Sequence, residues 1–192
     1  MLGVRWAQWT AGISCVMLAS RGVVIRVGKH VLLQVSGYTL FAWLSALAKN
    51  LHNFVAPLFI VSLLVFIVMF AKDNVYQRGD IGWLAKAWGM FVKGEHVPSW
   101  RFNMGEKVYF WIGVVFLCLA LSVTGLIMLF PNFDQVRSTM QLANMVHIAS
   151  AMVMIAFALG HIYVGTIGVE GAYRNMADGV TDKPSGTLPL VG

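Results

Sequence analysis

Apolar residues in this sequence occur in blocks long enough to cross a lipid bilayer, and this feature restricts the possible folds most strongly. A helix needs about 20 predominantly apolar residues to cross the hydrocarbon core. The stretch from residue 6 to residue 27 is a weaker candidate, because Arg21 and Arg26 interrupt it and must reach toward the head groups. Three stretches qualify without such charges, and they are residues 54–71, 109–130 and 144–167.

The amino-acid composition also indicates that this chain lies in a lipid bilayer. Hydrophobic residues make up 58% of the sequence and charged residues 11%, which excludes an ordinary water-soluble domain. A single segment in lipid can satisfy its backbone hydrogen bonds only as a helix. The sequence therefore predicts an all-α membrane protein with one domain over residues 1–192, a bundle of four transmembrane helices, with three as the alternative. Cys15 and Cys118 lie in apolar stretches and are expected to be buried thiols.

The basic residues indicate topology and not nucleic-acid binding. The net charge is +6, yet no basic run with interleaved aromatic residues occurs. Lys and Arg accumulate in cytoplasmic loops, so the basic loop 72–108 is predicted to be cytoplasmic, together with the tail 168–192. Within this loop, Leu84, Trp88 and Phe91 share one helical face and predict a short helix in the membrane interface. No cleavable targeting peptide is expected at the N-terminus.

Three histidines lie within or beside the predicted spans, where ionisable residues are costly and usually functional. His52 stands at the start of the second span, and His147 and His161 lie in the fourth. The second and fourth spans run in the same direction, so His52 and His147 are expected at a similar outer depth. Two imidazoles from facing helices at one level can hold the iron of a haem. The alternative for each histidine alone is a hydrogen bond between helices, and zinc would need further ligands that are not nearby.

His161 lies 14 positions after His147. At about 100° and 1.5 Å per residue, the two imidazoles fall within about 40° of one helix face, about 21 Å apart. His161 is therefore expected in the inner half of the membrane. The first span places Gln8 at this level, and glutamine is a poor ligand for haem iron. His30 and His96 lie outside the spans and are not expected to bind a cofactor.

Four segments of the sequence are similar to those of one known family. They are KNLHNFVAPLF at 49–59, KDNVYQRGDIGWL at 72–84, RFNMGEKVYFW at 101–111 and MVHIASAMVMIAFALGHIYVGTIGVEGAYRNM at 145–176. On these segments the chain, from about residue 28 to residue 178, resembles the gamma subunit, cytochrome b, of membrane-bound formate dehydrogenases. The resemblance implies a four-helix bundle of the di-haem cytochrome b type in the bacterial cytoplasmic membrane.

The resemblance also implies the roles of particular residues. His52 and His147 match the ligands of the outer haem b, and His161 matches one ligand of the inner haem. Asn103 and Gly105 match the loop at a quinone pocket. The partners implied are an iron–sulfur subunit, which donates electrons, and a molybdenum- or tungsten-containing catalytic subunit, where formate would be oxidised.

The sequence departs from the family pattern in its first span. Gln8 stands where the family carries the second histidine ligand of the inner haem, so one haem is expected and the second ligand is missing. Asn103 also has a structural interpretation, because asparagine is a favoured helix N-cap. Two other functions stay open, namely a cytochrome b subunit for another donor such as a hydrogenase, and a membrane anchor without cofactor.

Overall fold

The computed structural model describes residues 2–83, 85–86, 102–131 and 136–168. Within these ranges the ordered elements are helices, and no strand occurs. The expected interface helix with Leu84, Trp88 and Phe91 lies outside the described residues, as do His96 and nearly all of the tail 168–192. The helical architecture agrees with the predicted fold class.

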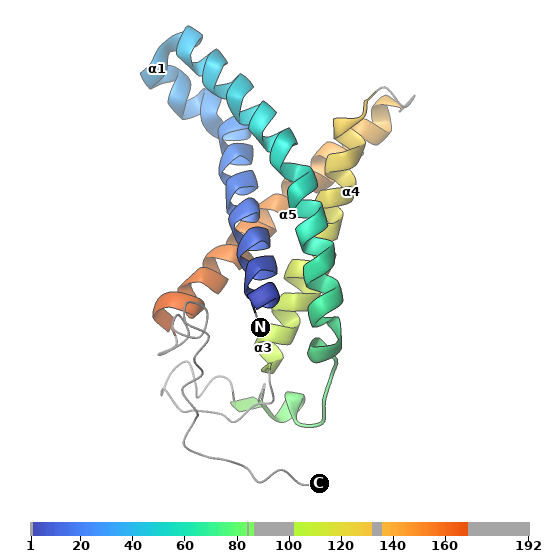
Figure 1. The fold of residues 1–192 in the computed structure, drawn as a ribbon. Coiled ribbons are helices and arrows are strands. Elements are labelled where there is room, and N and C mark those ends of the chain that lie inside the picture. Colours follow the sequence, from blue (N-terminus) through green and yellow to red (C-terminus); the bar gives the residue numbers. More distant parts are fainter. Residues whose placement is uncertain (1, 84, 87–101, 132–135, 169–192) are drawn as a thin grey trace. The chain divides into compact units, whose positions relative to one another are not determined.

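The longest element, α1, runs from Leu2 to Phe70 and contains two helical legs separated at Gly37. Gly37 has φ 74° and ψ 168°, a backbone conformation that is essentially restricted to glycine. Figure 1 shows the chain reversing here, so that residues 2–36 and 38–70 run in opposite directions. Leu18 and His52 are in contact across the two legs. Each helical leg is longer than the span predicted for it, 6–27 or 54–71. Which residues of each leg lie in the hydrocarbon core stays a prediction.

The next membrane-length element is built from three consecutive helical pieces. They are α3 (Met104–Val108), the π-helix η2 (Tyr109–Leu117) and α4 (Cys118–Leu129). Before them the short 3-10 helix η1 (Ala71–Asn74) follows α1. The last elements are α5 (Arg137–Tyr163) and the π-helix η3 (Val164–Gly168).

Three helical stretches are long and apolar enough to cross a membrane, namely Trp6–Asn74, Met104–Leu129 and Arg137–Ile167. Since the first contains the reversal at Gly37, the described residues hold four apolar helical segments. Large apolar side chains lie on their outside, for example Phe54 at 81% exposure and Phe116 at 68%. Such a surface suits lipid as solvent and would be unfavourable in water.

The chain divides into two compact units, Met1–Met154 and Ile155–Gly192, with the boundary inside α5. The first unit contains both legs of α1, the third apolar segment and the first part of α5. The second unit contains the last turns of α5 and η3. The histidine pair discussed below lies wholly in the first unit.

We predict that Gly37→Ala lowers the free energy of unfolding by about 1–3 kcal/mol, because the conformation of Gly37 is strained for any residue with a Cβ. Gly12→Ala is the matched control on the same helix, since its added methyl group meets nothing within 4 Å and alanine favours a helix by up to about 1 kcal/mol. Unfolding in detergent, followed by circular dichroism, measures both effects. Equal stabilities of the two variants would contradict the reversal at Gly37.

Candidate functional site

His52 and His147, which the sequence analysis expected at one depth, lie side by side. His52 is on the second leg of α1 and His147 is on α5. Their ring centroids are 6.4 Å apart and their planes are inclined by 70°. The rings form a T-shaped pair, and both are partly buried between apolar helices. The pair is therefore the candidate cofactor site.

Each imidazole already uses its Nδ1 atom. Nδ1 of His52 lies 3.2 Å from the carbonyl oxygen of Leu18, on the first leg of α1. A carbonyl only accepts hydrogen bonds, so Nδ1 of His52 carries the proton and donates it. Nδ1 of His147 lies 2.9 Å from Oγ1 of Thr124 on α4. These partners assign Nε2 of both rings as the nitrogen that can bind a metal.

The distance between the rings fits a haem iron held between them. With a metal–nitrogen bond of about 2 Å on each side and each ring centre about 1 Å behind its nitrogen, the two centroids of an axial pair lie about 6 Å apart. Both ring planes then contain the iron–nitrogen axis, so the angle between the planes is free to take a value such as 70°. The observed 6.4 Å agrees with this arrangement.

Glycines stand beside both rings. A Cβ atom added at Gly22 would lie 3.9 Å from Cε1 of His52, and one added at Gly125 would lie 3.4 Å from Cε1 of His147. The backbone of a neighbouring helix therefore approaches each imidazole without an intervening side chain. These glycines leave space for the imidazole rings between the helices, which haem ligands in a helix bundle require.

The remaining histidines differ from this pair. His161 lies in the last turn of α5, in the second compact unit, and its side chain is exposed. Gln8 lies on α1 in the first unit and is half-buried. His30 is exposed on the first leg of α1. An inner haem at His161 stays a prediction.

Asn103 caps the helix that opens the third apolar segment. Its Oδ1 accepts a hydrogen bond of 2.9 Å from the backbone N–H of Glu106, and the Glu106 carboxylate accepts one of 2.7 Å from the backbone N–H of Asn103. This reciprocal capping box confirms the structural interpretation of Asn103. The amide nitrogen of Asn103 is the group that can still donate to a ligand.

Gly105 has a packing role next to Asn103. A Cβ atom at Gly105 would lie 3.2 Å from Oδ1 of Asn103 and 3.5 Å from Cη2 of Trp83. The indole of Trp83 is buried, so it covers this glycine from the side of the preceding loop. The quinone contact expected for Asn103 and Gly105 stays a proposal.

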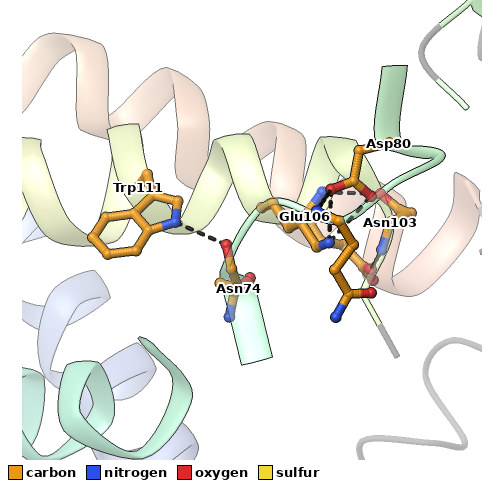
Figure 2. Close-up of polar contacts among 7 residues, drawn as sticks. Asn74, Asp80, Asn103, Glu106 and Trp111 are labelled. Atoms are coloured by element: carbon orange, nitrogen blue, oxygen red, sulfur yellow. Dashed lines mark hydrogen bonds and ion pairs between the residues drawn. The ribbon is translucent and has the colours of Figure 1, made fainter. Parts of the chain in front are cut away.

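An ion pair that the sequence analysis did not identify involves Asp80, which lies next to Asn103 and Glu106 in Figure 2. Nζ of Lys107 donates to Oδ2 of Asp80 at 2.8 Å and to Oδ1 at 3.1 Å, and the two side chains are only 4% and 5% exposed. The backbone N–H of Gln77 also donates to Asp80, at 2.8 Å. The hydrogen bond from Lys107, and then that from Gln77, hold the pKa of the Asp80 carboxyl below its ordinary value.

A second connection joins the same two parts of the chain. Nε1 of Trp111 donates to the backbone carbonyl oxygen of Asn74 at 2.9 Å (Figure 2). Between η1 and the start of the third apolar segment lies an open cavity of about 260 Å³. Residues that line it include Asn74, Lys107 and Trp111.

The arrangement of the site suits one class of protein. Two imidazoles from different apolar helices, each with Nδ1 engaged and Nε2 able to bind a metal, could serve as the axial ligands of a membrane cytochrome of the b type. Residues 4–179 match the family model described as prokaryotic cytochrome b561. The chain belongs to the prokaryotic cytochrome b561 family, and this membership implies a membrane protein that binds haem b.

Curated proteins with similar sequences agree with the resemblance. The formate dehydrogenase cytochrome b556(fdo) subunit of Escherichia coli strain K12 is 31% identical over 135 residues, which cover 69% of this chain and 63% of that protein. The formate dehydrogenase cytochrome b556 subunit of Haemophilus influenzae is 27% identical over 149 residues, with coverages of 72% and 62%. The chain therefore spans a little under two thirds of the length of these relatives.

We predict that Asp80→Asn lowers the free energy of unfolding by about 1–3 kcal/mol near neutral pH, because the Lys107 ammonium loses its carboxylate partner. The folded-state pKa of Asp80 is lowered, so this stabilisation is complete above the unfolded value of about 3.9 and is lost as the pH falls through the folded value. The difference between wild type and variant should be constant above about pH 5 and should shrink below about pH 4. Denaturation in detergent at a series of pH values measures it. A difference that persists in acid would contradict the ion pair.

Proposed function

We propose that this chain is the haem b-bearing membrane subunit of a formate dehydrogenase and passes electrons from an iron–sulfur subunit to membrane quinone. The observation that carries this proposal is the pair of imidazoles 6.4 Å apart, each with its Nδ1 atom engaged by another helix. The centroid separation matches that of an axial imidazole pair, and the Nδ1 contacts leave Nε2 of each ring as the nitrogen that could bind the iron.

Each residue of the outer site has a distinct task. His52 and His147 would be the two axial ligands, and bound haem b would supply one-electron exchange between donor and acceptor. The Leu18 carbonyl holds His52 in one tautomer, and the Thr124 hydroxyl does so for His147. The surrounding apolar helices keep bulk water away from the rings.

On the inner side we propose a quinone contact at the loop before α3. The amide nitrogen of Asn103 would donate to a quinone carbonyl, while its Oδ1 keeps the helix capped. The cavity next to Met104 has a volume of about 260 Å³, slightly less than typical pockets for small molecules. It would therefore suit the ring of a quinone without its isoprenoid tail. The Asp80–Lys107 pair would hold this end of the segment in place.

The donor and the location are inferred from the relatives and the charges. The relatives are named as cytochrome subunits of formate dehydrogenase, which supports an iron–sulfur subunit and a molybdenum or tungsten catalytic subunit as partners. The excess of Lys and Arg in residues 72–108 supports a multi-pass protein of the bacterial cytoplasmic membrane with this loop inside.

We predict that His52→Ala and His147→Ala each abolish haem at the outer site, because one imidazole cannot replace a six-coordinate pair. His30→Ala is the matched control, since His30 is an exposed histidine on the same helix as His52. Haem per chain, measured from the pyridine haemochrome and the reduced-minus-oxidised spectrum of purified protein, tests both. Unchanged haem in the two ligand variants would show that the iron is held elsewhere or that no haem site exists at this pair.

The proposed donor has its own test. In membranes that contain the whole complex, formate is expected to reduce the haem of this chain, while hydrogen is not, because only a formate-oxidising partner supplies electrons. An affinity-tagged chain should also copurify with an iron–sulfur protein. Reduction by hydrogen and not by formate would support the same cytochrome with a hydrogenase as donor.

A further inference from the structure

The two imidazoles of the outer site are held by different kinds of partner. Nδ1 of His52 faces a backbone carbonyl, that of Leu18, at 3.2 Å. Nδ1 of His147 faces a side-chain hydroxyl, that of Thr124, at 2.9 Å, and the ring of His147 also has a backbone hydrogen bond to Leu121. A substitution can remove the Thr124 hydroxyl but not a backbone carbonyl, so His147 is the ligand whose properties a side chain of this chain can set.

The single proton of the Thr124 hydroxyl is already used within α4. Oγ1 of Thr124 donates to the carbonyl oxygen of Ala120 at 2.6 Å, with a longer contact of 3.3 Å to that of Leu121. A hydroxyl has one donor and two acceptor lone pairs. Toward His147 the oxygen can therefore only accept, which requires Nδ1 of His147 to carry a proton. Thr124 is 8% exposed, so water does not compete for this bond.

The neighbouring residue on α4 completes the arrangement. A Cβ atom at Gly125 would lie 3.4 Å from Cε1 and 3.8 Å from Nδ1 of His147. The imidazole edge therefore rests against the backbone of α4, next to the Thr124 oxygen. A longer side chain at position 125 would separate the ring from this helix and from the hydroxyl.

We propose that Thr124 is a positioning residue that fixes the tautomer of His147 and tunes the haem held by the His52–His147 pair. This inference rests on the proposed haem ligation. A hydrogen bond accepted from the outer nitrogen of a ligand imidazole makes that ligand more basic. A more basic ligand favours the oxidised iron, so the Thr124 hydroxyl lowers the reduction potential of the outer haem.

The test compares Thr124→Val, which keeps the shape and removes the acceptor, with Thr124→Ser, which keeps the hydroxyl. At the wild-type midpoint potential, Thr124→Val is expected to raise the ratio of reduced to oxidised haem by roughly threefold to tenfold, tenfold being about 59 mV for a one-electron couple. Thr124→Ser should stay close to wild type. Ser122→Ala is the matched control, because it removes a similar hydroxyl bond on α4, that of 2.7 Å to the Cys118 carbonyl. Optical redox titration of the purified complex measures the ratio, and paramagnetic resonance of the oxidised haem reports the ligand field.

The outcomes separate this inference from the proposed function. If Thr124→Val binds haem with unchanged potential and unchanged resonance, the role of Thr124 is wrong while the ligand pair stands. If His147→Ala keeps its haem, the proposed function itself fails. If Thr124→Val does not assemble, Thr124→Cys replaces the hydroxyl by a weak acceptor of similar size, and an unshifted potential in that variant overturns the proposal.

Discussion

The need to satisfy imidazole nitrogens inside an apolar bundle determines how the helices of the first unit must meet. A polar ring in hydrocarbon is costly unless its nitrogens find partners. His52 finds the Leu18 carbonyl and His147 finds the Thr124 hydroxyl. Leu18 lies on the first leg of α1 and His52 on the second, while Thr124 lies on α4 and His147 on α5. Each of the four apolar segments therefore contributes one group. His147 also has a backbone hydrogen bond to Leu121 on the same segment as Thr124, so both of its protein partners come from one helix.

The meeting of His52 and His147 could be predicted because it depends on quantities visible in the sequence. Hydropathy sets where each span begins, the fixed helical rise sets depth, and alternating direction places the two histidines at the same side. Their partners could not be predicted. A backbone carbonyl such as that of Leu18 has no signature in the sequence, and a threonine within a span usually bonds only its own helix, as Thr124 also does. The side of α4 that faces His147 follows from packing alone.

The region around Asn103 gives the opposite result. The capping role of Asn103 was foreseen as one of two interpretations, because asparagine followed three residues later by Glu106 is a local pattern. The Asp80–Lys107 pair was missed, since 27 residues separate its members and a charge count for topology treats each lysine independently. The full bounds of α1 were missed as well, because the helices continue on both sides of Gly37 and the reversal is made by the backbone conformation of this single glycine.

The two polar sites follow different electrostatic rules. Two neutral imidazoles can lie between apolar helices, because each nitrogen needs a hydrogen bond or a metal and no counter-charge. Lys107 lies at the start of the third apolar segment, where the Asp80 carboxylate pairs with it and the Gln77 backbone N–H donates to that carboxylate. The imidazoles instead meet carbonyl and hydroxyl oxygens, with the Arg21 guanidinium of the first leg close enough to act electrostatically on His52. A charged side chain at position 124 would place a charge beside Nδ1 of His147, the nitrogen that the Thr124 hydroxyl contacts.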